Sequence, residues 1–561
     1  MLYRNLIKSL IKYPLSLWRG IRGEAVLILL LALTACDSYL EENPSDRIPA
    51  DEAYQTRNEL YLNAVAAIYR DVGGSENCQG LQGTGHGVYD LNTFTTDEAI
   101  MPTRGADWYD GGYWQALFLH KFAQADGTGD VWNYLMKEIQ GCNGSLSRID
   151  KFAKSNPNVD VSDLEAEVRA LRAMFYFYVM DLYGRVPIFT TTSPTVADLQ
   201  VKPRSETYRH IVGELQAVAP QLSEQRSNQP GNYYGRMTQG AAYFLLAKLM
   251  LNAEVYADDD WTDATRPDGS NIKWTINGQQ MNSWEATIHY CDKLQVLGYK
   301  LEGSFQENFA VNNEQSFENI YTIPMNKYLY DTQFINLFRS RHYNHAAAMG
   351  LNGENGSSAT IEAITAFGLK RDLNDMSDLD PRFYMTYYAG SAFDLNGNIV
   401  LLDDGTPLVY EPWHVALDVS GTAWEKTAGA RMAKYEVDPT GTKDGKQSDN
   451  DIVLFRYSDV LLMRAEALVR NGQDGNEPFN AVRNRVGAVP RECTLDNILT
   501  ERLLELAWEG WRRNDLIRFD RFTLSYTDRP QLPGEANHYT IVFPIPGEFL
   551  TLTSTSQNPG Y

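Results

Sequence analysis

The stretch from Ile452 to Arg521 constrains the fold of this chain more than any other. It opens with a strand-like run, after which Ser458 supplies a good N-cap and Asp459 places an acid in the first turn of a helix. Strong helix formers and regularly spaced apolar residues continue the pattern. The sequence therefore predicts a strand followed by three helices, at Ser458–Val469, at Pro478–Val486, and from Thr494 through Trp511.

The third of these helices mixes two tryptophans with many charges. Its charged residues are Glu501, Arg502, Glu505, Glu509, Arg512 and Arg513. Because Glu505 and Glu509 share a helix face, one interpretation is a pair of catalytic carboxylates. The other is a set of ion pairs to neighbouring helices, since buried Arg and Glu persist only when they are paired. We favour ion pairs because so many arginines lie within reach.

The bulk composition narrows the classes of function. The 561 residues are 43% hydrophobic, which is ample for a large core, and the net charge is −22. So acidic a chain argues against nucleic acid and anionic substrates and suits a neutral ligand. Four of the five cysteines lack metal or redox spacing, so we expect free, buried thiols, although an exported protein could join two of them. These four are Cys78, Cys142, Cys291 and Cys493.

Residues 1–35 have the pattern of an export signal. Basic residues precede the apolar run 25–32, which is too short to span a bilayer as a permanent helix. The run ends in Leu33-Thr34-Ala35-Cys36, which is similar to a bacterial lipobox, so Cys36 is predicted to carry the lipid. Residues 36–50 are acidic and are predicted to form a tether.

The rest of the chain divides into helical segments and one irregular block. Small and large residues alternate in the helical segments as in tetratricopeptide pairs, which predicts a stack of about four helix pairs. A capping box, Ser162 with Glu165, is expected to open the third segment. Residues 301–446 hold short strand-like runs, one of them at 317–324, and are too long for one free loop. The predicted fold is mainly α, a tetratricopeptide-like stack with an irregular second lobe containing short strands. The predicted helices are 52–72, 131–152, 164–183, 208–222, 240–256 and 284–297.

Several polar clusters could carry chemistry but have simpler interpretations. Asp258–Asp263 lacks the glycine and closing glutamate of a calcium loop, so a solvated turn is expected. Asp394–Asn398 predicts a hairpin turn. His342 and His345 are interpreted as a chance pair. Asp97–Glu98 is the first candidate for a glycosidase pair, a weak one because carboxylate separation is a spatial property. The sequence thus predicts no catalytic residues, cofactor or metal.

A glycine-flanked loop near residue 105 offers a better candidate site. Arg104 and Asp107 lie beside Trp108 and Tyr109, and two charges next to two rings are poor core material. Rings can stack on sugars while charged groups orient hydroxyls. The alternative is that these aromatics pack in the core. Two tyrosines of the irregular block would supply a second wall, which makes the candidate ligand-binding residues Arg104, Asp107, Trp108, Tyr109, Tyr328 and Tyr330.

Separated motifs resemble those of the SusD/RagB family of nutrient-binding lipoproteins. They occur in the family's order along nearly the whole mature chain. They are the helix start Arg456–Ala467, the run Glu501–Arg518, the tripeptide Asp380-Pro381-Arg382, and the endings 543–546 and 557–561.

The resemblance implies a binding protein that is not an enzyme. Family members capture nutrients, most often oligosaccharides, and pass them to a SusC-like TonB-dependent transporter. They are lipid-anchored and face the cell exterior from the outer membrane. The implied scaffold is 51–300 with 447–561, and the lobe 301–446 contributes to the ligand site. A peptide-binding member of the family and a glycoside hydrolase remain the alternatives.

Overall fold

A computed structural model gives the arrangement of most of the chain. It describes residues 54–75, 79–82, 86–125, 127–263, 265–334, 339–443 and 445–561. Cys36, the signal, the tether and Cys78 lie outside these residues. The chain divides into two compact units, residues 1–59 and 60–561. Of the first unit only 54–59 are described, and α3 (Arg57–Leu60) begins there.

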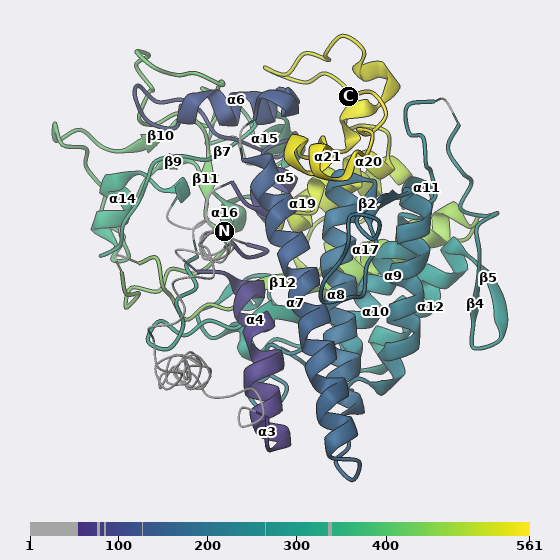
Figure 1. The fold of residues 1–561 in the computed structure, drawn as a ribbon. Coiled ribbons are helices and arrows are strands. Elements are labelled where there is room, and N and C mark those ends of the chain that lie inside the picture. The colour runs from purple at the N-terminus through teal and green to yellow at the C-terminus, as the bar shows by residue number, and fades with distance from the viewer. Residues whose placement is uncertain are drawn as a thin grey trace, which may run out of the picture. The chain divides into compact units, whose positions relative to one another are not determined.

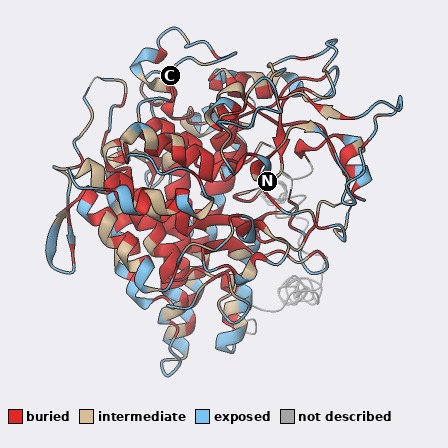
Figure 2. Cartoon of the chain, turned by 180° about the vertical axis from the view of Figure 1, so that it is seen from behind, coloured by how far each residue is buried: buried red, intermediate tan, exposed pale blue. Residues whose placement is uncertain are grey.

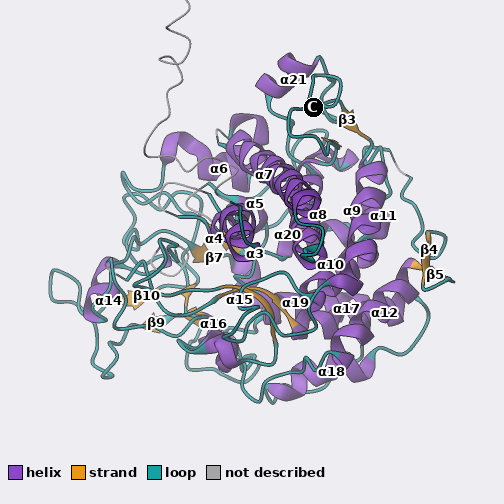
Figure 3. Cartoon of the chain, turned by 60° about the horizontal axis from the view of Figure 1, so that its bottom comes forward, coloured by secondary structure: helices purple, strands orange, loops and turns teal. Residues whose placement is uncertain are grey.

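The second unit contains a stack of helices that contact one another in sequence. Helix α7 packs on α8, α8 on α9, α9 on α10, α10 on α12, and α12 on α17, which in turn contacts α18 and α19. Figures 1 and 3 show these helices gathered on one side of the unit. This arrangement agrees with the predicted helix-pair stack. The bounds are α4 Ala66–Gly73, α7 Thr128–Ser155, α8 Ser162–Tyr183, α9 Arg204–Val218, α10 Gln239–Leu251, α11 Ala253–Tyr256, α12 Ser283–Val296, α17 Tyr457–Arg470, α18 Asn476–Arg485 and α19 Leu495–Leu506.

The opening strand of the C-terminal stretch pairs far back in the sequence. Strand β12 (Ile452–Arg456) runs antiparallel to β6 (Asn319–Ile323), and every residue of both strands is buried. Both strands were predicted. The pair ties the irregular block to the start of α17, because Tyr457 also donates its N–H to the Glu318 carbonyl at 2.8 Å.

The helix expected from Thr494 through Trp511 is in fact two helices. Helix α19 ends at Leu506, and α20 (Arg512–Arg518) starts after a turn. Within that turn Trp508 has φ 66° and Gly510 has φ 74°. Trp508 donates its backbone N–H to the Glu98 carboxylate at 2.7 Å. Tertiary hydrogen bonds therefore override the helical propensity at this point.

Apart from β6, residues 301–446 form short helices, turns and two-residue strands (Figure 3). Each strand pairs antiparallel with one other: β9 with β10, β8 with β11, and β7 with β1. The last pair brings residues near 100 to this block. The bounds are β1 Ala99–Ile100, β7 Ser358–Ala359, β8 Tyr387–Tyr388, β9 Gly390–Ser391, β10 Val409–Tyr410, β11 Arg431–Met432, α14 Tyr343–Ala348, α15 Ile361–Ala366 and α16 Phe383–Thr386.

Shorter elements complete the second unit. In the part of the chain that the structure describes, no helix is long and apolar enough to cross a membrane. The remaining bounds are α5 Val88–Thr93, α6 Tyr113–Phe118, α21 Gly547–Thr553, β2 Val186–Pro187, β3 Val201–Lys202, β4 Lys273–Ile276, β5 Gln279–Asn282, the π-helix Tyr61–Val65, and the 3-10 helices Asp110–Gly112, Phe122–Gln124, Ala219–Gln221, Gln306–Phe309, Asn313–Gln315, Glu535–Asn537 and Tyr539–Ile541.

The buried core lies mostly among the helices (Figure 2). Cys142, Cys291 and Cys493 are free, buried thiols, as predicted. The capping box predicted at Ser162 is wrong, because α8 begins at Ser162 itself and the Ser162 N–H is taken by Asp160 at 3.0 Å. A capping box is present instead at α12, where Asn282 and Glu285 each accept the other's backbone N–H.

Candidate functional site

The charged residues of the C-terminal stretch are occupied by one another. Arg456, fully buried, donates to Glu505 at 2.5 Å and to Glu509 at 2.7 Å. Arg382 donates to Glu501 at 2.6 Å and also to Glu505 at 2.9 Å. These carboxylates neither face a cavity nor lack a cation, so the ion-pair interpretation is confirmed and Glu505 and Glu509 are not a catalytic pair.

The carboxylates Asp97 and Glu98 also have structural partners. Asp97 accepts two hydrogen bonds from Arg512, at 2.7 and 2.8 Å. Glu98 is fully buried, and this desolvation raises its pKa to about 7 despite the hydrogen bond from Trp508. Both carboxylates are thus engaged by groups of the protein, which favours a structural role over a glycosidase pair.

The polar cluster Asp394–Asn398 forms the turn expected of it. The Asp394 carboxylate accepts the backbone N–H groups of Asn396 and Asn398, and Phe393 bridges to Ile399, which makes a hairpin. No group of acidic, histidine or cysteine side chains able to hold a metal ion occurs among the described residues.

The loop near residue 105 is a tight turn held by contacts with the irregular block. Arg104 and Asp107 exchange two backbone hydrogen bonds of 3.0 Å, and Gly105 has φ 64°. Thr103 bridges to Asp418, which fastens the loop to the irregular block. Because the turn is closed in this way, Asp107 and Tyr109 project outward and are exposed, Tyr109 by 53%.

Arg104 does not belong with the ligand-facing residues. It is 4% exposed, and its guanidinium donates to the carbonyls of Glu425 at 2.8 Å and Ala428 at 2.9 Å and to the Ser358 hydroxyl at 2.9 Å. Burial and then Arg431 nearby hold its pKa well below the usual range. The expectation that Arg104 orients ligand hydroxyls is therefore wrong, since its donors are already used to hold the loop.

Trp108 is half-buried and positioned by its surroundings. Its indole N–H donates to the Glu354 carbonyl at 2.9 Å, and its backbone has φ 61°. A Cβ at Gly356 would lie 2.7 Å from the ring, so only glycine fits there. Trp114 meets the ring edge-on at 6.1 Å between centroids. Trp108 is thus a fixed wall with one part open to solvent.

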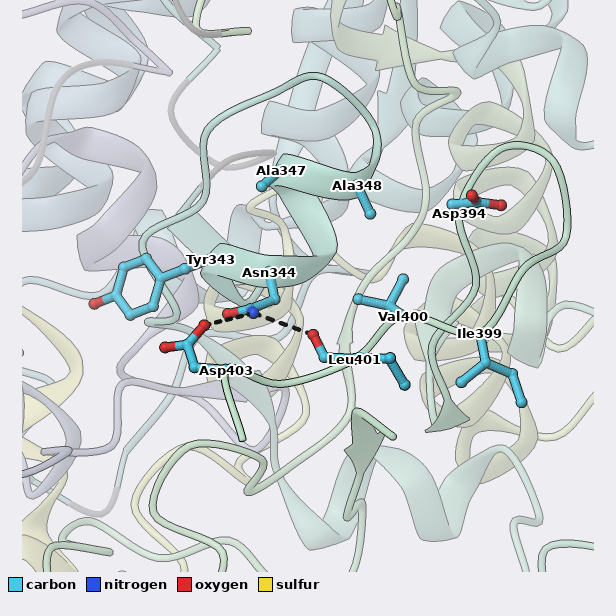
Figure 4. Close-up of a pocket in the computed structure, with 9 residues that line it drawn as sticks. All are labelled: Tyr343, Asn344, Ala347, Ala348, Asp394, Ile399, Val400, Leu401 and Asp403. Atoms are coloured by element: carbon cyan, nitrogen blue, oxygen red, sulfur yellow. Dashed lines mark hydrogen bonds between the residues drawn. The ribbon is translucent and has the colours of Figure 1, made fainter. Parts of the chain in front are cut away.

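A hollow of about 400 Å³ lies at helix α14 (Figure 4). The helix supplies Tyr343, which is 44% exposed and donates its hydroxyl to Asp107 at 2.9 Å. It also supplies Asn344, whose amide donates to the Leu401 carbonyl at 3.1 Å and to the Asp403 carboxylate at 2.9 Å. The loop near 105 and α14 are therefore joined by one hydrogen bond. The lining residues are Tyr343, Asn344, Ala347, Ala348, Asp394, Ile399, Val400, Leu401 and Asp403.

The apolar wall of this hollow follows from strand alternation. Val400 is buried in a small core with Ala392, Leu408 and Tyr410. Its neighbours in the sequence, Ile399 and Leu401, consequently point outward, and each is 51% exposed. The hollow thus combines apolar surface with a phenol, an amide and carboxylates, a mixture suited to an uncharged molecule with many hydroxyl groups.

Two buried histidines, His342 at the N-cap of α14 and His345 within the helix, are uncharged at neutral pH. Burial, followed by repulsion from Arg431, lowers the pKa of His342 to about 4, and burial lowers that of His345 to about 4. Tyr343 keeps its proton because burial and the bond to Asp107 raise its pKa to about 12. No titration near pH 7 is expected in these three groups.

The structure brings together only part of the predicted set. Asp107 meets α14 through Tyr343, and Tyr109 extends from the same turn. Tyr330 lines a different cleft, described below, and Tyr328, which is 75% exposed, lines neither hollow. The sequence analysis did not select Tyr343 and Asn344. The pattern that could have indicated them is an aromatic residue followed by an amide residue at the start of a short alanine-rich helix.

Comparisons with known proteins identify the family. The SusD family model matches residues 278–561, and a second model, described as starch-binding associating with outer membrane, matches residues 82–251. The chain belongs to the SusD family.

Relatives and solved structures agree with this assignment. The starch-binding protein SusD of Bacteroides thetaiotaomicron is 25% identical over 427 residues, 71% of this chain and 72% of the relative. SusD-like protein P25 of Formosa agariphila is 24% identical and covers 88% of each chain. A laminarin-binding SusD-like protein superposes with a TM-score of 0.64 at 21% identity, covering 91% of this chain and all of the other. Surface glycan-binding protein A of Bacteroides thetaiotaomicron, in complex with laminarihexaose, has a TM-score of 0.64 at 18% identity, covering 90% of this chain and 99% of the other.

Proposed function

We propose that this protein binds oligosaccharides at the cell surface, in the hollow beside α14. The observation that carries the proposal is the joined surface of Asp107, Tyr343 and Asn344, with Tyr109 exposed on the same turn as Asp107, which presents exposed rings and hydrogen-bonding groups. Sugars need both, a flat apolar face for the ring and polar groups for the hydroxyls. Relatives described as starch-binding and laminarin-binding support this chemistry.

The site favours uncharged glycans over acidic ones. Asp394 and Asp403 line the hollow, Asp107 is hydrogen-bonded to Tyr343 of its lining, and Arg104 is buried. A uronic acid or sulfated sugar would meet carboxylates with no exposed arginine to offset them. Two or three stacking rings give weak binding, in the micromolar to millimolar range at roughly 4–8 kcal/mol.

The same proposal includes delivery and anchoring. We expect Cys36 to carry the lipid, the protein to face the exterior from the outer membrane, and the ligand to pass to a SusC-like TonB-dependent transporter. The family supports these steps, and the helical stack is the surface we assign to the transporter. Replacing Cys36 with Ala should release the protein from the membrane fraction, and affinity purification from solubilised membranes should recover a barrel protein.

The site is tested with isothermal titration of maltoheptaose and laminarihexaose into wild type, Tyr343→Ala and Tyr343→Phe. Losing the ring should weaken binding by up to about thirty-fold, since one stacked face buries roughly 75 Å² of apolar area, or ~2 kcal/mol. Removing only the hydroxyl should cost less and should free Asp107. Tyr384→Ala is the matched control, because Tyr384 is also 44% exposed but lies outside the hollow.

Two outcomes would contradict the proposal. One is equal affinity in Tyr343→Ala and Tyr384→Ala. The other is the absence of binding to any member of a panel that also contains peptides. Release of new reducing ends from the same glycans would instead favour the glycoside hydrolase alternative.

A further inference from the structure

A second cleft in residues 60–561 is lined by an unusual number of tyrosines. It measures about 470 Å³, within the range of small-ligand sites. Its walls come from the π-helix and α4, from residues 234–236, from strand β6, and from residues 329–332. None of its lining residues belongs to the hollow beside α14. The tyrosines are Tyr61, Tyr69, Tyr234, Tyr321 and Tyr330.

The backbone around this cleft is shaped to keep it open. Gly235 has φ 70°, and a Cβ on it would lie 2.3 Å from the Pro324 ring. Gly73 faces Ile323 and Thr332, each 3.0 Å from where its Cβ would be. Glycine is thus required at one wall and favoured at another. A fixed wall of this kind limits the freedom that a bound molecule would otherwise have to remove.

The two arginines that line the cleft are paired within the protein. Arg236 binds both carboxylate oxygens of Glu167, one at 2.8 Å, and its guanidinium lies 4.4 Å from the centre of the Tyr61 ring. Arg70 forms an ion pair with Asp71 at 2.7 Å. The cations therefore have carboxylate partners already, and the cleft offers an anion little net attraction.

Donors and ring faces remain for an uncharged ligand. Tyr321 lines the cleft, and its hydroxyl is fully buried and makes no hydrogen bond to any described residue. A buried hydroxyl without a partner is costly unless a ligand or water supplies one. Tyr330 stands at the edge, 43% exposed, with its backbone held by Asn326 and Gln447. A ring presented on a held backbone is ready to stack on a flat apolar face.

We propose that this cleft is a second carbohydrate site, which takes one or two sugar units of an uncharged glycan. The inference rests on the proposed function, since it concerns the same class of ligand. Two sites on one chain would let a long glycan bind at both, which raises the apparent affinity without any new contact.

The test is calorimetry with maltoheptaose and laminarihexaose on a Tyr109→Ala/Tyr343→Ala background, which weakens the hollow beside α14. Residual weak binding should fall about ten-fold on adding Tyr330→Ala. It should not change on adding Tyr328→Ala, a control two residues away whose side chain does not line the cleft. Ala66→Trp, which fills the cleft from α4, should abolish the residual binding. Thermal melting of each variant checks that the fold is kept.

The outcomes separate the two proposals. If wild type binds glycan but Tyr330→Ala, Tyr328→Ala and Ala66→Trp all leave the residual binding alike, the second site is wrong and the proposed function stands. If the background variant binds no glycan at all while wild type does, the second site is again wrong. If wild type binds neither glycan, the proposed function fails and this inference fails with it.

Discussion

Buried arginines are handled in opposite ways in the C-terminal stretch Ile452–Arg521 and around the loop near residue 105. In the C-terminal stretch, Arg456 and Arg502 each contact two or more carboxylates. Around the loop, Arg104 and Arg431 are equally buried but donate to backbone carbonyls and a serine, with no carboxylate partner in their hydrogen bonds.

The difference follows from what each region leaves unsatisfied. Helices satisfy their own backbone, so long side chains are needed only to fasten one helix to another. Loops leave carbonyls without donors, and one guanidinium with five N–H groups can satisfy several of them. Burial lowers the pKa of Arg431 to about 10, whereas Arg456, beside Glu509 and Glu505, has a pKa well above its usual range. The stack is thus fastened by charge pairs and the site by backbone hydrogen bonds.

The largest expected effect breaks the charge network. Arg456→Met should lower the free energy of unfolding by about 3–5 kcal/mol, because it leaves Glu505 and Glu509 buried beside one cation fewer. Urea denaturation measures the change. Arg464→Met in α17 is the control, since its pair with Asp292 is partly exposed and should cost less than ~1 kcal/mol. Equal losses in the two variants would contradict the comparison.

A smaller effect concerns Glu98, a buried carboxylate held by a backbone N–H. Its folded pKa, about 7, lies above the usual value near 4.5, so its contribution to stability is full below pH ~4 and is lost as pH rises through 7. Glu98→Gln should therefore raise stability at pH 8 by up to ~3 kcal/mol and by less than ~1 kcal/mol at pH 5. Unfolding curves at both pH values decide this, and a change that does not depend on pH would refute it.

Removing a backbone-bonded arginine should cost less than breaking the network. Arg104→Met leaves the carbonyls of Glu425 and Ala428 without this donor, a loss of about 1–3 kcal/mol. Because the loop would then lose its support, glycan affinity should fall although Arg104 touches no ligand. Calorimetry with laminarihexaose measures it. Unchanged affinity, or a stability loss matching that of Arg456→Met, would overturn this view.

The smallest effect on stability is expected at the exposed ring. Tyr109→Ala should change the free energy of unfolding by less than ~0.5 kcal/mol and weaken glycan binding by up to ten-fold. Trp108→Ala should weaken binding similarly but also cost ~1–2 kcal/mol of stability, because its indole is hydrogen-bonded to Glu354. A stability loss from Tyr109→Ala as large as that from Trp108→Ala would mean that Tyr109 packs in the core.

Local patterns predicted the scaffold well. The sequence alone predicted the strand at 317–324, the helix after Ser458 and the paired charges, because periodicity and pairing rules act over short distances. The break at Ala507–Trp511 was not, since it depends on Glu98, some 410 residues away. The capping box predicted at Ser162 failed for a similar reason over a shorter distance, because Asp160 accepts the Ser162 N–H that the capping box would use.

The site was less predictable than the scaffold. The loop at 104–109 was recognised by composition, but which of its residues turn inward depends on carbonyls near 356 and 425. Tyr343 gains its position from Asp107, 236 residues away in sequence. Tyr330 was assigned to the same site because it lies near the start of the irregular block. In the structure it lines a separate cleft. Long-range partners of this kind have no signature in one sequence.

Lys434 connects the irregular block to the C-terminal end of helix α19. Its ammonium donates to the carbonyls of Glu505 and Ala507 at 3.0 and 2.7 Å and to Glu509 at 2.6 Å, which closes the end of α19 from the irregular block. Excising residues 301–446 would leave strand β12 without its partner strand and the Ala507 carbonyl without this donor. New ligand specificities are therefore expected to arise in the hairpin tips around 393–407, which can vary without disturbing these contacts of Lys434.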